Sequence, residues 1–291
     1  MIELRVAASD ADLELWRQVR LAVSPDERCP TVEELRRRAA PGSLYLVAEL
    51  DGALAGSGIS GRSDLGGAFL MPRVVPGLRR RGVGSELLRA LAAHAAAIGY
   101  AQAIGHVGDP GSLAFAEGFG FREIGRQVGQ VRKLRPDEPP ATPPPGIELI
   151  SLAEEPGLFG RAYDELAAAV LADVPVPRRP QVSREDWLRD WQPWPAASFV
   201  AVLDGAIVGY AGLYRDDTRA EHSLTAVRRD LRGRGLAKAL KQAEAEAAAR
   251  HGVRELTSWT QDANVQMQAV NRALGYVQRD VSISIAAALP L

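Results

Sequence analysis

The sequence has little of what would place it in several common classes of protein. Its single cysteine, Cys29, excludes an internal disulfide and any cysteine-rich metal site, as is typical of a reducing compartment. No apolar run approaches the about 18 residues of a membrane-spanning helix, and no basic segment followed by an apolar one opens the sequence. The 35 Lys and Arg residues balance the 36 Asp and Glu residues, so no global field attracts nucleic acid or an anionic membrane. We therefore expect a cytoplasmic protein whose partners include neither nucleic acid nor a membrane.

What the sequence does have is the composition and length of a globular protein with two domains. It is 46% hydrophobic and 24% charged, and its 291 residues suffice for two cores of roughly 150 residues each. The segment KLRPDEPPATPPPG, residues 133–146, contains six prolines, which bias a chain toward extended structure and stiffen a linker. We expect an N-terminal domain over 1–134, a proline-rich linker over 135–146 and a C-terminal domain over 147–291.

The two halves carry the same motifs at a constant spacing. LVAELDGALAGSG from Leu46 matches FVAVLDGAIVGYA from Phe199, an offset of 153 residues. The same offset relates RRRG at 79–82 to RGRG at 232–235. An offset held across two separated motifs indicates an internal duplication, and so two domains of one fold.

Each copy reads as the same order of strands and helices. Asp-Gly pairs at 51–52 and 204–205 separate alternating apolar runs, which predicts two-residue hairpins whose turn residues take positive φ. Helical patterns are found before the hairpins at 10–23, 31–40, 158–171 and 184–192, and after the glycine-rich loops at 85–98 and 238–250. Helices and strands alternate, which predicts an α/β or α+β fold around a mixed sheet.

An arginine- and glycine-rich loop joins a strand to a helix in each copy, within VVPGLRRRGVGSELL and TAVRRDLRGRGLAKAL. Unpaired N–H groups at the start of a helix attract anionic oxygens, above all those of phosphates, and glycine lets a phosphate reach the backbone. Neither loop ends in the Gly-Lys-Ser/Thr of a P-loop, and Leu87 and Lys238 stand where a dinucleotide-binding loop needs its third glycine. The pattern that remains is Arg-x-x-Gly-x-Gly/Ala, at 79–84 and 232–237.

With hairpin, loop and a later Gly-aromatic pair taken together, each half resembles the GNAT (Gcn5-related) N-acetyltransferases, and the whole resembles a tandem GNAT protein. The resemblance implies two tandem domains, each a mixed, mostly antiparallel sheet flanked by helices. It implies acetyl-CoA as cosubstrate and no metal, with the pyrophosphate on the loops and the pantetheine along the preceding strand. It assigns cofactor binding in the first copy to Val74, Val75, Arg79, Arg80, Arg81, Gly82, Val83 and Gly84, and in the second to Thr225, Ala226, Val227, Arg232, Gly233, Arg234, Gly235, Leu236, Ala237 and Asn264.

The resemblance also favours the second copy as the catalytic one. Some members of the family use a glutamate as general base on the strand before the loop; eleven residues before the loop arginine stands Glu221 in one copy but Ala68 in the other. His222 is a second candidate, and because neighbouring strand residues face opposite ways, only one of the two can point into the cleft. The family's usual general acid is a tyrosine just ahead of the Gly-aromatic pair. Ala116 and Asn271 stand at this position in the two copies, so neither copy has the tyrosine, and Asn271 is a site candidate by position alone.

The expected activity is transfer of an acetyl group from acetyl-CoA to an amine of a small molecule or peptide, by direct attack in the C-terminal domain of a monomer or homodimer. The alternative is a non-catalytic acyl-CoA-binding or scaffolding protein built from degenerate acetyltransferase domains, since both copies lack the tyrosine. Trp187, Trp191 and Trp194 recur at roughly helical spacing, which is typical of a core face or of the wall of an acceptor pocket.

Overall fold

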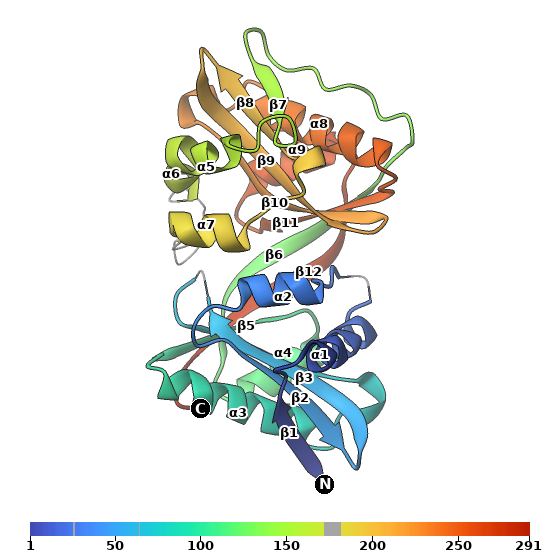
Figure 1. The fold of residues 1–291 in the computed structure, drawn as a ribbon, viewed down its shortest axis with the longest axis vertical. Coiled ribbons are helices and arrows are strands. Elements are labelled where there is room, and N and C mark those ends of the chain that lie inside the picture. Colours follow the sequence, from blue (N-terminus) through green and yellow to red (C-terminus); the bar gives the residue numbers. More distant parts are fainter. Residues whose placement is uncertain (26, 64, 172–181) are drawn as a thin grey trace. The chain divides into compact units, whose positions relative to one another are not determined.

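A computed structural model of the chain describes residues 1–25, 27–63, 65–171 and 182–291 (Figure 1). It divides into two compact units by its internal contacts. Unit 1 consists of Met1–Gly125 together with Ser282–Leu291, and unit 2 consists of Arg126–Val281.

The sheet of unit 1 has the strand order β1-β2-β3-β4-β5-β12. Neighbouring strands are antiparallel except β4 and β5, which are parallel. Its strands are β1 (Ile2–Val6), β2 (Leu44–Leu50), β3 (Ala53–Arg62), β4 (Ala68–Val74), β5 (Gln102–Val107) and the end of β12 (Val277–Ala288). Its helices are α1 (Asp10–Val23), α2 (Val32–Arg38), α3 (Val83–Ala97) and α4 (Pro110–Glu117), with a 3₁₀ turn, η1 (Pro76–Leu78).

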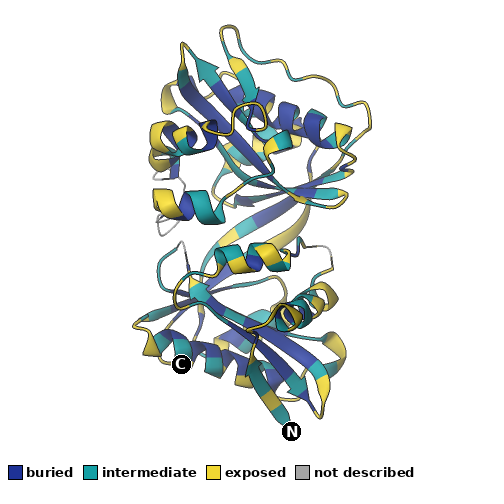
Figure 2. Ribbon diagram, viewed as in Figure 1, coloured by how far each residue is buried: buried dark blue, intermediate teal, exposed yellow. Residues whose placement is uncertain are grey.

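Helices cover both faces of this sheet, because each has one apolar side. Ser9 and Thr31 close capping boxes at the starts of α1 and α2, which fix where these helices begin. On their face of the sheet, Trp16 packs with residues of β2 in one core cluster. On the other face, Leu87 and Leu91 of α3 are fully buried in a second cluster. Figure 2 shows the central strands of this sheet and part of α3 as buried, whereas β1 is intermediate to exposed.

The sheet of unit 2 repeats this plan with the order β6-β11-β10-β9-β8-β7, in which only β10 and β11 are parallel. Its strands are β6 (Arg122–Lys133), β7 (Glu148–Ser151), β8 (Phe199–Leu203), β9 (Ala206–Asp216), β10 (Arg219–Val227) and β11 (Glu255–Gln261). Its helices are α5 (Leu158–Ala162), α6 (Ala168–Leu171), α7 (Arg184–Asp190), α8 (Leu236–Arg250) and α9 (Val265–Ala273), with a π-helical turn, η2 (Tyr163–Ala167), and two 3₁₀ turns, η3 (Pro195–Ala197) and η4 (Arg229–Leu231). The predicted fold class is confirmed in both units.

The two hairpins have the backbone that their sequences predict. Asp51 and Gly52 have φ of 52° and 80°, and Asp204 and Gly205 have φ of 50° and 79°. A turn of this kind joins strands that share the right-handed twist, so it sets the register of β2 with β3 and of β8 with β9.

The two units exchange a strand between the copies of the repeat. Residues 127–133 of β6, from the first copy, pair with 255–261 of β11 in unit 2. Residues 283–288 of β12, from the second copy, pair with 102–107 of β5 in unit 1. The copies of the repeat and the compact units therefore have different boundaries.

The tryptophans divide between core and periphery. Trp187 on α7 is fully buried, its Nε1 donates to the Phe159 carbonyl at 3.0 Å, and its ring lies 4.9 Å from that of Phe159 and 5.6 Å from that of Trp191. Trp194 lies beyond the end of α7, with its ring 4.8 Å from the Arg215 guanidinium. Every helix of the described residues is too short or too polar to cross a bilayer.

Candidate active site

In the sheet of each unit, the two parallel strands separate after a short pairing and leave an opening between them. The pairing of β10 with β11 covers only three residue pairs and ends at Glu221 with Thr257, although β10 continues to Val227. In unit 1 the pairing of β4 with β5 ends at Phe69 with Ile104. An unpaired strand edge presents a row of backbone donors and acceptors, to which an extended ligand can add as another strand.

A β-bulge in β10, beside this opening, reverses which face of the sheet the alternate side chains of the strand lie on. Its register with β9 shifts between His222 and Thr225. Before the bulge, Ala220 packs in the cluster beneath α8, whereas after it Leu224 and Ala226 pack in the cluster beneath α5 and α7. In the sequence these residues keep the same alternation, so the change of face is not visible there. The paired register of β4 with β3 has no such shift.

Glu221 lies where the parallel strands separate. Ala220 and His222 on either side of it face α8, so the side chain of Glu221 is on the α5 and α7 face of the sheet, half-buried. The position 153 residues earlier, Ala68, is instead fully buried in the core cluster beneath α3. Only unit 2 thus has a carboxylate at this point.

His222 points to the opposite face and belongs to a buried cluster. Its Nε2 lies 2.6 Å from the Tyr276 hydroxyl and its Nδ1 3.0 Å from Oε2 of Glu244 on α8. Burial, with the nearby Lys241 charge, holds the pKa of His222 well below its usual value, so the ring is neutral at pH 7. A neutral imidazole that is hydrogen-bonded to the Tyr276 hydroxyl and packed beside Glu244 contributes to the core beneath α8.

Lys241 and Glu244 complete this cluster from one turn of α8. Neither is more than 1% exposed, and the Lys241 ammonium lies 5.4 Å from the centre of the Tyr276 ring. Burial raises the pKa of Glu244 to about 8 and lowers that of Lys241 to about 8. On a helix pattern alone both residues read as solvent-exposed, so sequence reasoning missed them.

Asn271 is fully buried between α9 and the sheet. Its Nδ2 donates to Gln130 Oε1 at 2.9 Å, and lies 3.2 Å from Ser258 Oγ and 3.4 Å from Thr260 Oγ1. Gln130 is on the exchanged strand β6, so this polar network joins residues 141 positions apart. No local signal could have placed Gln130 here.

Tyr210 on β9 and Ser223 on β10 flank the bulge, and sequence reasoning missed both. A Cβ at Gly212 would come within 2.3 Å of the Tyr210 hydroxyl and 2.6 Å of the Ser223 hydroxyl, so only glycine fits between them. Burial raises the pKa of Tyr210 well above its usual value, which keeps the phenol protonated.

The arginine- and glycine-rich loops have matching backbones in the two units. Gly82 and Gly235 are the N-cap residues of α3 and α8, with φ of 90° and 85° and no capping side chain. Nothing lies within 4 Å of a Cβ built on Gly235. Arg79 Nε donates to the Val74 carbonyl at 3.2 Å and Arg232 Nε to the Val227 carbonyl at 3.0 Å, which ties each loop to the end of its strand. The free first turn of the helix is a site for phosphate oxygens.

The other loop residues contribute in different ways. Val83 and Leu236 are buried core side chains, so only their backbone faces the loop. Arg80 has φ of 64°, where the second copy has Gly233 at 77°. The side chains that extend into solvent around the loops are Arg79, Arg80, Arg81, Arg232 and Arg234, while Gly84 and Ala237 follow in the first helical turn.

Near the ends of β4 and β10, backbone N–H groups are directed into the opening. The N–H of Val75 bonds to Ala55 on β3, and that of Arg228 bonds to Val208 on β9. Since N–H groups alternate in direction along a strand, the preceding N–H groups, those of Val74 and Val227, point the other way, toward the separated strand.

Asn264 begins α9 and caps it. Its Oδ1 accepts from the Met267 N–H at 3.1 Å, as Asp109 Oδ1 accepts from the Ser112 N–H at 2.9 Å at the start of α4. The Ser112 hydrogen bonds lower the pKa of Asp109, and the charge of Arg79 adds to this effect. Both side chains are therefore committed to their helices.

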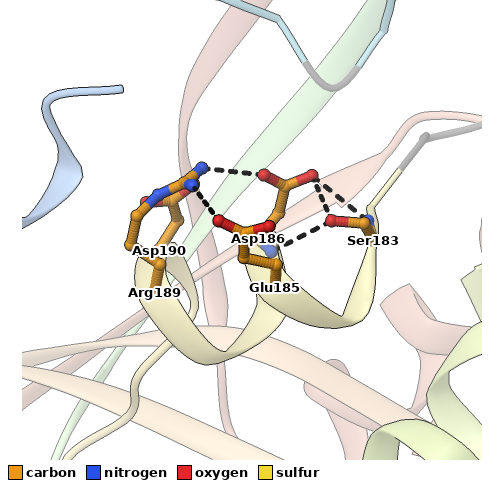
Figure 3. Close-up of polar contacts among 5 residues, drawn as sticks. All are labelled: Ser183, Glu185, Asp186, Arg189 and Asp190. Carbon is orange, nitrogen blue, oxygen red and sulfur yellow. Dashed lines mark hydrogen bonds and ion pairs between the residues drawn. The ribbon is translucent and has the colours of Figure 1, made fainter. Parts of the chain in front are cut away.

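Most of the charged side chains of α7 pair with one another (Figure 3), while Arg184 pairs with Asp164 of η2 at 3.0 Å. Asp186 accepts from Ser183 Oγ at 2.7 Å and from Arg189 at 2.7 Å, and Arg189 also pairs with Asp190 at 2.8 Å. A depression of about 570 Å³ here is lined by Arg184, Glu185, Leu188 and Arg189. Among the described residues, no group of three or more His, Cys, Asp or Glu side chains could hold a metal ion.

Comparison with known proteins gives one consistent result. Residues 11–121 and 161–276 each match the Acetyltransferase (GNAT) family. The chain is 31% identical over 277 residues to a mycothiol acetyltransferase of Actinosynnema mirum, covering 90% of this chain and 91% of the relative. It is 30% identical over 251 residues to a mycothiol acetyltransferase of Clavibacter michiganensis subsp. michiganensis, covering 84% and 79%.

Solved structures share the fold at lower sequence identity. A GCN5-related N-acetyltransferase from Sphaerobacter thermophilus matches with a TM-score of 0.76 and 22% identity over 99% of this chain and 95% of that one. A tandem GNAT protein from the clavulanic acid biosynthesis pathway also gives 0.76, with 21% identity over 99% and 98%. With both halves matched by the family and nearly the whole chain by its members, the chain belongs to the GNAT family and is an N-acetyltransferase.

Proposed function

We propose that unit 2 transfers the acetyl group of acetyl-CoA to the amine of a small molecule by direct attack, with Glu221 as general base. The observation that carries this is the position of Glu221, half-buried on the α5 and α7 face where β10 leaves β11. Acetyl-CoA supplies an activated thioester; the residues of the chain bind it, orient it and move the proton.

The loop at 232–237 fits the anionic part of this cosubstrate. Its glycine N-cap has no side-chain cap, open space around the missing Cβ and positive φ, so phosphate oxygens can reach the N–H groups of the first turn of α8. From there an extended chain can run beside the unpaired edge of β10 toward Glu221.

Two groups of unit 2 then act on the reacting atoms. The carboxylate of Glu221 accepts the proton of the amine, because only the free amine attacks a carbonyl carbon. The backbone N–H of Thr225 points into the opening like that of Val227 and lies four residues from Glu221, beyond the bulge; it donates to the carbonyl oxygen as negative charge develops on it. The N–H of Val227, nearer the loop, is left to the extended part of the cosubstrate.

Unit 1 has the loop but not the carboxylate. Ala68 is fully buried on the α3 side, and β4 keeps an unshifted register. We therefore propose that unit 1 binds an acyl-CoA or serves a structural role, without catalysing acetyl transfer.

The acceptor is proposed from the relatives. Proteins similar to this chain over most of their length are named mycothiol acetyltransferases, so a small-molecule amine of that class is the first acceptor to test.

Replacing Glu221 by Gln tests this mechanism. The amide keeps the shape but cannot take a proton, and a general base contributes about 10²–10⁴-fold, so kcat should fall by at least about tenfold near pH 7 with little change in the KM for acetyl-CoA. Since amine acceptors have pKa values of about 8 to 10, raising the pH supplies free amine and should recover part of the loss. Release of the CoA thiol, measured with and without acceptor, is the readout.

Glu148→Gln on β7 is the matched control, because the Glu148 side chain is exposed at the far strand of the same sheet. Equal kcat in wild type and Glu221→Gln from pH 6 to 9 would remove Glu221 from the mechanism. No acceptor-dependent thiol release across a panel of amines, at any pH, would instead favour the acyl-CoA-binding alternative.

A further inference from the structure

Unit 1 buries an arginine that no described residue satisfies. Arg73 on β4 is 7% exposed, and no hydrogen bond or ion pair joins it to a residue in the described ranges; its nitrogens keep only this small contact with solvent. Buried arginines are almost always paired, because an uncompensated charge away from water is strongly unfavourable. Such a group indicates a missing partner.

The nearest side chains position the guanidinium but do not accept from it. Its central carbon lies 5.9 Å from the centre of the Trp16 ring, which is itself held by a 2.9 Å hydrogen bond from Nε1 to the Gly58 carbonyl. Ser57 stands directly opposite Arg73 on β3, so the two side chains share a face. Ser57 is fully buried, and its hydroxyl has no hydrogen-bond partner among the described residues.

Among the described residues, the charges that act on Arg73 are those of Arg20 and Glu27, so with Arg73 itself one positive charge is in excess. The Nη2 of Arg20 on α1 lies 3.3 Å from Glu27 Oε2, so this carboxylate is already engaged. Burial, followed by the charge of Arg20, lowers the pKa of Arg73 to about 9, while Glu27 and Cys29 act in the opposite direction. Arg73 is still charged at pH 7, and a single negative charge would compensate it.

Arg73 also stands where a ligand in the opening of unit 1 would end. It directly precedes Val74, whose carbonyl ties down the loop through Arg79, and β4 has parted from β5 after Phe69. A molecule with phosphates on residues 79–84 and a chain beside β4 reaches the side of the strand on which Arg73 lies.

We propose that Arg73 and Ser57 form a carboxylate-binding site in unit 1. The planar guanidinium suits the two oxygens of a carboxylate, to which the Ser57 hydroxyl adds a third donor. Two sources can bring this group: the distal carboxylate of an acyl chain carried by CoA, or a free carboxylic acid. The first source rests on the proposed binding of acyl-CoA by unit 1, and the second does not.

The test compares two stable thioethers, S-(3-carboxypropyl)-CoA and S-butyl-CoA, which differ by a carboxylate in place of a methyl group. Calorimetry on the full chain carrying Gly235→Glu confines binding to unit 1. We expect the carboxylate ligand to bind at least tenfold more tightly, about 1.4 kcal/mol. Arg73→Met should abolish that difference and leave the affinity for S-butyl-CoA unchanged. Arg89→Met, at an exposed arginine of α3, is the matched control.

Free glutarate supplies the second arm, read as the rise in Tm of wild type against Arg73→Met. If Arg73→Met changes only the binding of the CoA thioethers, the source of the carboxylate is an acyl chain. If it changes only the rise in Tm with glutarate, the source is a free acid. If S-butyl-CoA fails to bind, the acyl-CoA role of unit 1 fails, and glutarate alone decides the site. The proposal is overturned if the protein binds S-(3-carboxypropyl)-CoA no more tightly than S-butyl-CoA and glutarate does not raise its Tm.

Two further variants guard against misfolding. Arg73→Lys keeps the charge without the planar fork, and Ser57→Ala removes only the hydroxyl, so each should reduce the preference severalfold. Ligand-free Arg73→Met should melt at or above the wild-type Tm, because it removes an unpaired buried charge. A fall of more than about 4 °C would mean that the charge is satisfied inside the protein, which would contradict the proposal.

Discussion

At the scale of single residues, the side chains beneath α8 show how far burial changes a charged group. Glu244 has no exposed surface, and its Oε2 lies 3.0 Å from His222 Nδ1. Burial raises the pKa of this carboxyl to about 8 from 4.5, so the folded protein keeps a proton that the unfolded chain releases. Since the folded state binds more protons between these values, the stability from this group is complete below about pH 4.5 and is lost as the pH rises toward 8.

Glu244→Gln should therefore gain stability relative to wild type as the pH increases. The neutral amide has no proton to lose, so the urea midpoints of the two proteins should lie close together at pH 5 and separate by pH 8. The separation is limited to about 1.4 kcal/mol for each pH unit. Loss of the carboxylate also favours the neutral form of Lys241, which acts in the same direction. Parallel profiles from pH 5 to 8 would show that Glu244 is ionised in the folded protein.

At the scale of the element, the loop before each helix owes its chemistry to one glycine. Gly235 combines positive φ with open space where its Cβ would be, and the N–H groups behind it have no capping side chain. Any side chain there adds strain of about 1 kcal/mol, and one longer than a methyl group covers the donors.

Gly235→Glu should abolish acetyl-CoA binding by unit 2, because it puts a carboxylate where phosphate oxygens approach the backbone. Calorimetric stoichiometry is the measure. Gly235→Ala is the control for strain alone: it should lower the unfolding free energy by about 1 kcal/mol and retain binding. Gly82→Glu asks the same of unit 1. Undiminished affinity and stoichiometry in a folded Gly235→Glu protein would refute the assignment of the loop.

At the scale of the whole molecule, the chain folds by exchanging strands. Ile285 and Ala287 of β12 belong to the core of unit 1, and Gln130 of β6 belongs to the buried network of unit 2. Each copy of the repeat by itself therefore leaves one unit without an edge strand, and an open β5 or β11 edge is prone to association.

Fragments 1–134 and 135–291, produced together, should co-purify as a one-to-one complex, since each supplies a strand to the sheet of the other. Removing 126–134 from the first fragment should leave unit 2 incomplete and lower its Tm. Size-exclusion chromatography and thermal melting measure both effects. If each fragment alone is monomeric and melts cooperatively at the temperature of the full chain, each half takes back its own strand, and the exchange is not required for folding.

The sequence by itself determined the features that depend on neighbours along the chain. Positive φ at Asp-Gly turns, the glycine N-caps of α3 and α8 and the duplication of the loop are local properties, and the structure has each of them. Helix α3 begins at Val83 and α8 at Leu236, two residues before the expected starts at 85 and 238, because the glycine itself is the cap. The position of Glu221 on the strand before the loop could likewise be counted from the loop arginine.

The tertiary structure alone decided which strand pairs with which and which way each side chain faces. Gln130 meets Asn271 across 141 residues, and the bulge after His222 turns Leu224 and Ala226 to the face opposite Ala220 although the sequence alternation is unbroken. Lys241 and Glu244 are buried on a helix whose pattern would expose them. The physical reason is the same in each case: strand partners are chosen by packing between segments far apart in the chain, and a local pattern carries no information about the segment that arrives on its other side.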